Sequence, residues 1–149
     1  MTRTAAPTTR AVSDQDYASI VHFYAGHGQL LDAGQAEEWA EQFTEDGVFG
    51  QNVKPEPKRG RAAIAAAMRK GIDAIEARGL TRRHWFGMVE ASVVEDDVVR
   101  TRYYATVFET PSGGEPRLYL STTAEDVLER RDGRWLVRSR LITHDGTPA

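Results

Sequence analysis

The sequence predicts an α+β domain, with helices in its first half and an antiparallel sheet in its second half. Apolar residues recur at helical spacing as far as Arg78. After Thr81 the period changes to two, and β-branched and aromatic residues concentrate in four long segments. Short connectors join these segments, which implies antiparallel pairing because a parallel crossover needs about a dozen residues or more. Such a sheet has to bury an apolar face, so we expect it to curl around the helices.

Composition narrows the class of protein. A chain of 149 residues, 40% hydrophobic and 28% charged, is long enough to close one core and has the balance of a globular domain. Its formal net charge of -3 does not suggest the basic face of a nucleic-acid binder. The absence of cysteine excludes disulfides, thiolate nucleophiles and cysteine metal sites. No apolar run approaches the roughly 20 residues that span a bilayer, and the N-terminus lacks a secretory signal. We therefore expect a cytoplasmic protein without a nucleic-acid or membrane partner.

The N-terminal part of the chain divides into an arm and a helix. Residues 1–12 lack periodicity and predict a flexible arm, whereas residues 13–149 predict a single domain. Ser13 and Asp16 form a capping pair at the start of the first amphipathic helix, which we expect to end near Asp32.

A second, short helix is indicated by four apolar residues that share one face, Ala36, Trp39, Ala40 and Phe43. The turn dipeptide Asp46-Gly47 ends it. Residues 48–51 are consistent with a short strand, and residues 52–60 carry two prolines and predict an exposed loop. An alanine-rich third helix is predicted over residues 61–78.

The sheet is predicted to consist of four long strands joined by three turns. The strands cover residues 81–94, 98–109, 117–131 and 134–145. The connectors are an acidic turn at 95–97, a Pro- and Gly-containing turn at 111–114 and Asp-Gly at 132–133.

Three segments of this chain resemble a known family. They are L-L-D-A-G-Q-A-E-E-W-A-E-Q-F-T-E-D-G-V-F from Leu30, R-R-H-W-F-G around His84, and E-R-R-D-G-R-W-L-V before the last strand. With this order of elements, the chain after Ser13 resembles the SnoaL-like branch of the nuclear transport factor two-like superfamily. Within that branch it is most similar to scytalone dehydratase, bile acid dehydratase and hexachlorocyclohexane dehydrochlorinase. The resemblance implies a cone-shaped α+β barrel, in which three helices and a strongly curved sheet enclose a cavity, and chemistry without a metal or organic cofactor.

Asp32 and His84 match the catalytic pair of the resembled lyases, in which the histidine removes a proton and Trp39 matches a following tryptophan. A carboxylate bonded to the far nitrogen of an imidazole fixes its tautomer and strengthens it as a base. The resemblance therefore implies that His84 is the catalytic base and Asp32 its orienting partner. From the residues alone, the alternative is that Asp32 caps the second helix and His84 is a core histidine.

Further substrate-binding residues are expected around this pair. His27 lies with Tyr24 and Leu31 on the inward stripe of the first helix. The resemblance to bile acid dehydratase implies a polar, cavity-lining role at His27 and His144, where that enzyme carries a tyrosine and an arginine. Trp39 is expected in the core or in the cavity wall. Whether His144 faces the cavity or lies exposed near the C-terminus stays open.

Phe108 departs from the resembled lyases, which carry a histidine or an aspartate at the matching position. That polar group helps a leaving hydroxyl depart, and a phenylalanine cannot donate a proton. We expect Phe108 to form an aromatic wall of the pocket, which argues against a dehydration like theirs.

Asp126 matches an acidic position of the resembled lyases. Its place in a strand predicts a cross-strand ion pair with Arg138 or Arg140, although a position facing the cavity stays open. The arginines from Arg130 to Arg140 alternate with acidic and apolar residues and predict a solvated face of the sheet.

No metal or phosphate site is indicated. His22 and His27 are five residues apart, which is off the spacing of helical zinc ligands, and no glycine-rich phosphate loop is present. We expect neither a metal nor an organic cofactor.

Together with the resemblance, these residues predict a cofactor-independent lyase, isomerase or cyclase of the SnoaL-like dehydratase and cyclase type. It would use a His-Asp general base on a small apolar substrate, polyketide-like or polycyclic, as in secondary metabolite biosynthesis. The alternative is a non-catalytic module that binds a ligand or a partner, as the small subunit of ring-hydroxylating dioxygenases does. An apolar outer face with Tyr119 and Val127 predicts a homo-oligomer, a dimer or a trimer. The identity of the substrate and the choice among dehydration, isomerisation and cyclisation stay open.

Overall fold

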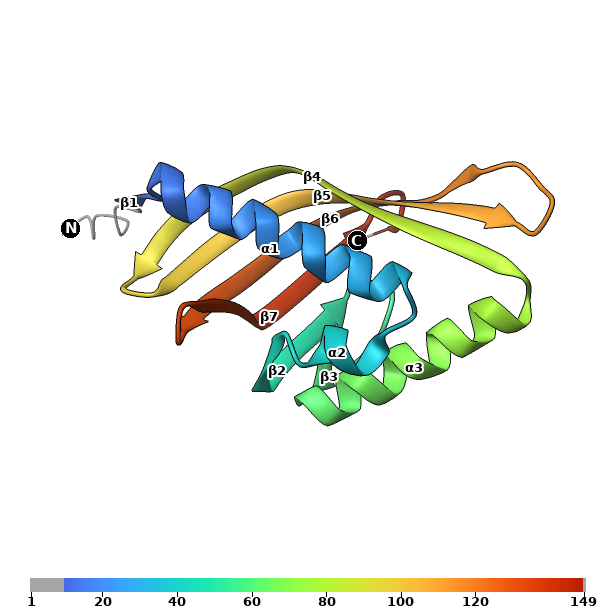
Figure 1. Ribbon diagram of the computed structural model, residues 1–149, viewed down its shortest axis with the longest axis horizontal. Coiled ribbons are helices and arrows are strands. Elements are labelled where there is room, and N and C mark those ends of the chain that lie inside the picture. The colour runs from blue at the N-terminus through green and yellow to red at the C-terminus, as the bar shows by residue number, and fades with distance from the viewer. Residues whose placement is uncertain (1–9, 149) are drawn as a thin grey trace.

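The computed structural model describes residues 10–148, which form a layer of helices packed on a seven-stranded sheet (Figure 1). The helices are α1 (Asp14–Asp32), α2 (Ala36–Ala40) and α3 (Arg61–Ala77). The strands are β1 (Arg10–Ala11), β2 (Phe43–Gln51), β3 (Lys58–Arg59), β4 (Leu80–Glu95), β5 (Val98–Pro111), β6 (Arg117–Arg131) and β7 (Arg134–His144). The predicted α+β class is confirmed. None of the helices described in residues 10–148 is long and apolar enough to cross a membrane.

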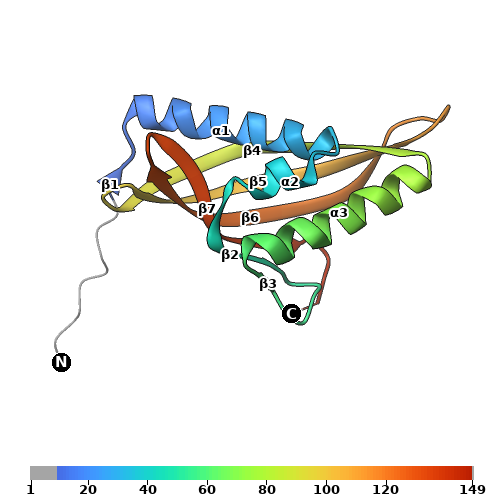
Figure 2. The ribbon, with the colours of Figure 1, turned by 60° about the horizontal axis from the view of Figure 1, so that its bottom comes forward.

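Helix α1 begins and ends where the sequence predicted. The Ser13 hydroxyl accepts a hydrogen bond from the backbone N–H of Asp16 at 3.1 Å, which satisfies one of the free donors of the first turn. The stripe Ile20, Tyr24, His27, Gly28 and Leu31 is buried. In both ribbon views α1 runs beside β4, and α2 lies between α1 and α3 (Figures 1 and 2).

Helix α2 is shorter than predicted, because Phe43 begins a strand. Phe43 pairs with Val137 of β7, and the Val137 N–H donates to the carbonyl of Gln42 at 2.8 Å. Long-range pairing with β7 thus overrides the helical spacing of Phe43. The turn dipeptide Asp46-Gly47 lies within β2, at an irregularity of its register with β7. The predicted strand over residues 48–51 is the second half of β2.

The four long strands β4 to β7 are confirmed, with ends within two residues of those predicted, and neighbouring pairs of them are antiparallel. The sheet as a whole is mixed, because β2 pairs with β7 in parallel. The chain between β2 and β7 contains α3 and three long strands, so it can return to the same edge in a parallel sense.

Where the resemblance implied a cone-shaped barrel, the sheet formed by the described residues is open at both edges and does not close on itself. Its strand order is β1-β4-β5-β6-β7-β2-β3, so β1 and β3 lie at opposite edges, and no pairing joins them among residues 10–148. The short strand β3 falls within the predicted loop over residues 52–60 and pairs with Val48 and Phe49.

Two residues of the predicted N-terminal arm are part of the sheet. Arg10 pairs with Val93 and Ala11 with Ser92 at the edge of β4. Residues 1–9 of the predicted arm lie outside the described residues.

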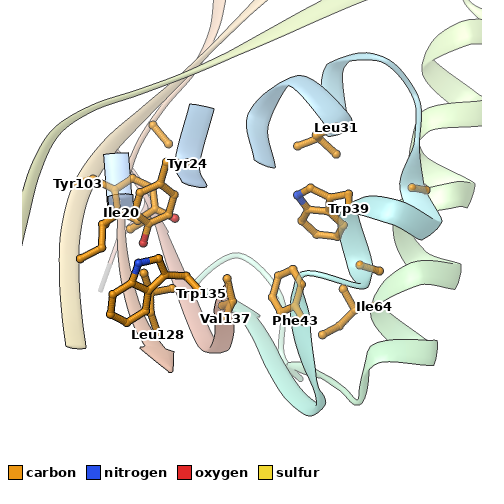
Figure 3. Packing of buried hydrophobic residues seen from close by; sticks show 14 of the residues in the cluster. Ile20, Tyr24, Leu31, Trp39, Phe43, Ile64, Tyr103, Leu128, Trp135 and Val137 are labelled. Carbon is orange, nitrogen blue, oxygen red and sulfur yellow. The ribbon is translucent and has the colours of Figure 1, made fainter. Parts of the chain in front are cut away.

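The buried core fills the space between the helices and the inner face of the sheet (Figure 3). One group of side chains, which includes Ile20, Tyr24, Tyr103 and Trp135, lies toward the start of α1, and a second group, with Trp39, Phe43 and Ile64, lies near α2 and α3. Aromatic rings make up much of both groups.

Candidate active site

A cavity of about 380 Å³ lies between the helices and the inner face of the sheet. Its walls are mostly apolar and include Leu31, Trp39, Phe49, Phe86, Val107 and Ile142. A few polar side chains interrupt them, among them Asp32, Gln51, His84, Thr122, Arg140 and His144. An apolar cavity with a small number of polar groups is the usual form of a small-molecule site.

Asp32 and His84 are joined by hydrogen bonds at the edge of this cavity. Asp32 is the last residue of α1, and His84 is near the start of β4. The Asp32 carboxylate lies 2.6 Å from Nδ1 of His84 and also accepts the His84 backbone N–H at 3.1 Å. An ionised carboxylate is only an acceptor, so in the neutral imidazole Nδ1 carries the ring proton and Nε2 the lone pair. The pair can therefore act as a general base at Nε2.

The geometry rules out the helix-cap alternative for Asp32. The N-cap of α2 is Gln35, which makes no side-chain capping hydrogen bond, and the carboxylate of Asp32 is used by His84. The His84 side chain is 23% exposed and that of Asp32 is 13% exposed, so neither is sealed in the core. Within residues 10–148, no protein group forms a hydrogen bond with Nε2 of His84.

His27 is buried behind the cavity wall and does not line it, which corrects the prediction. Its ring stacks between Phe23 and Trp39, with both centroid distances at 5.3 Å. Nε2 accepts a hydrogen bond from the Arg140 guanidinium at 3.0 Å, so Nδ1–H donates to Gln42 at 2.7 Å. Burial, together with the charge of Arg140, lowers the pKa of His27 well below its ordinary value. His27 is therefore a neutral structural residue that orients Arg140.

Tyr24 is also absent from the cavity wall, because its hydroxyl belongs to a buried network around Asp126. The Asp126 carboxylate accepts hydrogen bonds from Tyr24 at 2.8 Å and from Tyr103 at 3.0 Å. Burial and the nearby carboxylate raise the pKa of both phenols. The network holds Asp126 in the core rather than in the cavity.

Asp126 and Arg140 form the predicted cross-strand ion pair. Two nitrogens of Arg140 donate to the two oxygens of Asp126, each at 2.9 Å. Burial alone would lower the pKa of Arg140, but the charge and hydrogen bonds of Asp126, together with the nearby Tyr103 and Tyr24, raise it. Arg140 is only 4% exposed, so the prediction of a solvated arginine face is wrong for this residue.

Phe108 points away from the cavity, which corrects the predicted aromatic wall. Its neighbours Ala105 and Val107 line the cavity, and Phe108 lies on the opposite face of β5 with 38% of its surface exposed. Side chains alternate along β5, and because Ala105 and Val107 face inward, the next residue, Phe108, faces outward.

Trp39 and His144 line the cavity, as the sequence predicted for Trp39 and left open for His144. His144 Nε2 lies 3.0 Å from the side-chain oxygen of Gln51. The backbone N–H of His144 donates to the Asn52 side chain at 2.9 Å, which ties the end of β7 to the end of β2.

Several residues that line the cavity were not predicted from the sequence. Phe86 follows His84 by two residues and Ile142 precedes His144 by two, so strand alternation placed both on the inner face. Arg140 lies on the same face of β7 as Ile142 and His144. It was not predicted to line the cavity, because its charge assigned it, with the neighbouring arginines, to a solvated face. Within the part of the chain that the structure describes, no group of three or more histidine, aspartate or glutamate side chains is arranged to hold a metal ion.

Comparisons with solved structures find close likeness along nearly the whole chain. Aln2 from a Streptomyces species is 29% identical with a TM-score of 0.84, and the alignment covers 91% of this chain and 95% of that chain. ActVI-ORFA from Streptomyces coelicolor is 32% identical with a TM-score of 0.82, over 89% of this chain and 99% of that chain. A protein from Catenulispora acidiphila, solved in complex with S-DNPA, is 35% identical with a TM-score of 0.76, over 89% of this chain and 96% of that chain.

A comparison with curated proteins finds no match. The SnoaL-like domain matches residues 13–141, which include all three helices and most of the sheet. A further likeness, at 28% identity and a TM-score of 0.76, is to an NTF2-like protein from Novosphingobium aromaticivorans. The chain therefore belongs to the SnoaL-like domain family, within the nuclear transport factor 2-like superfamily.

Proposed function

We propose that this protein is a cofactor-independent lyase, isomerase or cyclase that removes a proton from a small apolar substrate. The observation that carries the proposal is the Asp32–His84 pair at the edge of an apolar cavity, with Nδ1 of His84 held at 2.6 Å by the carboxylate. The substrate class is polycyclic or polyketide-like, in keeping with walls made largely of aromatic and aliphatic side chains. The structure of the Catenulispora acidiphila protein with S-DNPA supports a small-molecule site in this fold.

The proposed step begins at Nε2 of His84. Its lone pair takes a proton from a substrate carbon, and the electrons of that C–H bond pass into the substrate as an enolate or a new double bond. The ring becomes an imidazolium, which the negative charge of Asp32 stabilises. The proton then returns to another atom of the substrate or leaves with a departing group, which gives isomerisation, ring closure or elimination.

The residues of β5 that line the cavity, Ala105 and Val107, offer no acid for a departing hydroxyl. His144 is the second imidazole on the cavity and is the candidate to return a proton. This arrangement favours isomerisation or cyclisation over a dehydration that needs an acid on β5.

Hydrogen–deuterium exchange tests the proposal without knowledge of the natural substrate. The probe is 2-tetralone, a two-ring ketone whose C–H groups next to the carbonyl are acidic. In D₂O, the protein should speed their exchange above the buffer rate, as followed by proton NMR. Exchange no faster than in buffer would overturn the proposed base. A ligand that survives purification, identified by mass spectrometry, would name the substrate class.

The second candidate is a module of the same fold that binds a ligand without transforming it. A cavity alone serves either role, because function depends on the site and not on the fold. The exchange measurement separates the two, since a binding module holds 2-tetralone without removing its protons.

A further inference from the structure

The three lysines of the chain lie around a single groove, which does not include the Asp32–His84 pair. The groove has a volume of about 500 Å³ and lies between α3 and the segment that leads from β2 into β3. In both ribbon views α3 lies beside β2 and β3 (Figures 1 and 2). Lys54 lies in the connecting segment, Lys58 in β3 and Lys70 in α3. The fold thus brings together positive charges from two different parts of the sequence.

The groove is positively charged, although the chain carries a formal net charge of -3. Its lining residues, which all belong to the described part of the chain, include a single carboxylate, that of Glu56. Within residues 10–148, none of the three lysines forms an ion pair, and all three are exposed. Three ammonium groups and one carboxylate therefore line the same hollow, and their summed charge attracts an anion from solution.

Apolar side chains line the groove next to these charges. Phe49 pairs with Lys58 across β2 and β3, so the two side chains lie on the same face of this strand pair. Ile64 and Met68 lie one helical turn apart on α3 and share a face of that helix. A surface that combines apolar side chains with ammonium groups is complementary to a molecule with an apolar body and an acidic group.

Gly71 leaves open space where the groove adjoins the cavity. It is an interior residue of α3, where a glycine is less favourable than an alanine. A Cβ at this position would meet no atom within 4 Å, so packing within the protein does not require the glycine. Gly71 lines both the groove and the cavity, as do Phe49 and Met68. A ligand can therefore approach the backbone of α3 here, beside the shared wall.

We propose that this groove binds an apolar molecule that carries an acidic group, such as an aromatic carboxylic acid. The ring system packs against Phe49 and Met68 beside Gly71, and the carboxylate binds the ammonium groups of the three lysines. The site does not depend on the proposed function, because neither Asp32 nor His84 lines the groove. The acidic group has two sources that the test separates: the substrate of the adjoining cavity, or a separate acid.

A matched pair of probes tests the charge. 2-Naphthylacetate is anionic, and 2-naphthylacetamide has the same rings and nearly the same shape without the charge. In calorimetric titrations at low salt, the protein should bind the anion about three- to tenfold more tightly than the amide, since each exposed ion pair contributes little. The preference should shrink in about 0.5 M salt, because salt screens exposed charges. Equal affinities at low salt would overturn the proposal.

A charge-matched pair of variants places the site. The lysine variant combines Lys54→Gln, Lys58→Gln and Lys70→Gln. The control variant replaces three exposed arginines outside the groove: Arg59→Gln, Arg78→Gln and Arg134→Gln. Arg59 follows Lys58 in β3 but pairs with Val48, so it points to the opposite face. The lysine variant should bind the two probes equally, and the control should keep the preference for the anion. A preference that survives in the lysine variant, or that falls equally in both, would contradict the assignment.

The lysines also report binding directly. Lysine labelled with ¹³C at Cε gives one signal for each of the three lysines, and single Lys→Gln variants assign them. 2-Naphthylacetate should shift these signals more than 2-naphthylacetamide does. Signals that respond alike to both probes, or to neither, would show that the carboxylate binds elsewhere.

Substitution of Gly71 tests where the rings lie. Gly71→Leu should fill the open space and weaken binding of both probes by about tenfold. Gly26→Leu is the control, because Gly26 is an exposed interior residue of α1 whose Cβ would also meet no atom within 4 Å. Unchanged affinity in Gly71→Leu would disprove the placement of the rings.

Competition identifies the source of the acidic group. If 2-tetralone displaces 2-naphthylacetate, the groove holds the acidic group of the cavity's substrate; simultaneous binding assigns the groove to a separate acid. If exchange of 2-tetralone fails while the lysine variant loses its preference for the anion, the catalytic proposal is wrong and the groove site stands. Exchange without any preference for the anion has the opposite meaning.

Discussion

The carboxylate of Asp32 accepts two hydrogen bonds from a single residue, His84: one from ring Nδ1 at 2.6 Å and one from the backbone N–H at 3.1 Å. The backbone contact ties the end of α1 to the start of β4, and the ring contact sets the direction of the imidazole. The residue that orients the proposed base is thus also a structural link between helix and sheet. Such double anchoring limits the freedom of the imidazole before a substrate binds.

His84→Ala should lower the rate of proton removal by about 10²- to 10⁴-fold, the usual effect of losing a general base. The substitution trims a partly exposed side chain, so the melting temperature should change by only a few degrees. The measurement is 2-tetralone exchange, with His22→Ala, on the exposed side of α1, as the control. A His84→Ala variant with the wild-type rate would remove His84 from the mechanism.

Asp32→Asn should also lose activity, on the order of 10²- to 10⁴-fold, because a neutral amide cannot stabilise the imidazolium. The amide oxygen can still accept the His84 backbone N–H, so the link between α1 and β4 should persist. Exchange rates and circular dichroism of Asp32→Asn and of Asp14→Asn, an exposed position in the same helix, check this. Full activity in Asp32→Asn would show that the carboxylate charge is not needed.

Asp126→Ala should destabilise the fold by about 3–5 kcal/mol, because it leaves the buried Arg140 guanidinium without its partner. The matched control is Glu125→Ala, the adjacent residue, whose ion pair with Arg100 is about half exposed at 3.6 Å. The Glu125→Ala substitution should lower the free energy of unfolding by less than about 1 kcal/mol. Urea unfolding of both variants measures the difference, and equal losses would contradict a special role for the buried pair.

The buried His27 should make stability fall on acidification. Because its pKa is lowered in the folded protein, the unfolded chain binds a proton below about pH 6.5 that the folded protein does not. The free energy of unfolding should therefore decrease as the pH drops below about 6.5, by at most about 1.4 kcal/mol per pH unit from this residue. His27→Gln should flatten the slope, and His22→Gln should not. An unchanged slope in His27→Gln would disprove the assignment.

The outer face of the sheet should form a contact between copies of the chain. Trp85, Tyr104 and Leu141 point to this face and are 70%, 58% and 50% exposed. Apolar side chains gathered on one face favour association. Light scattering at micromolar concentration should show a dimer or trimer, and Tyr104→Glu should dissociate it. Val53→Glu, on the loop after β2, is the control; a monomeric wild-type protein would contradict the expectation.

The sequence was enough to predict those helices and strands whose signals lie within a few neighbouring residues. The Ser13 cap and the end of α1 near Asp32 were predicted because capping and helical spacing act over a few residues. The four long strands were predicted for the same reason, and the family resemblance supplied the pairing of Asp32 with His84.

Only the tertiary structure decided which side of an element faces the cavity. Phe43 joined a strand because β7 pairs with it. Neither His27 nor Arg140 lies where it was expected: the histidine is buried behind the cavity wall, and the arginine, paired with Asp126, lines the cavity. Helical and strand periods act over a few neighbouring residues, whereas burial of a charge and the register of a strand depend on partners far along the chain.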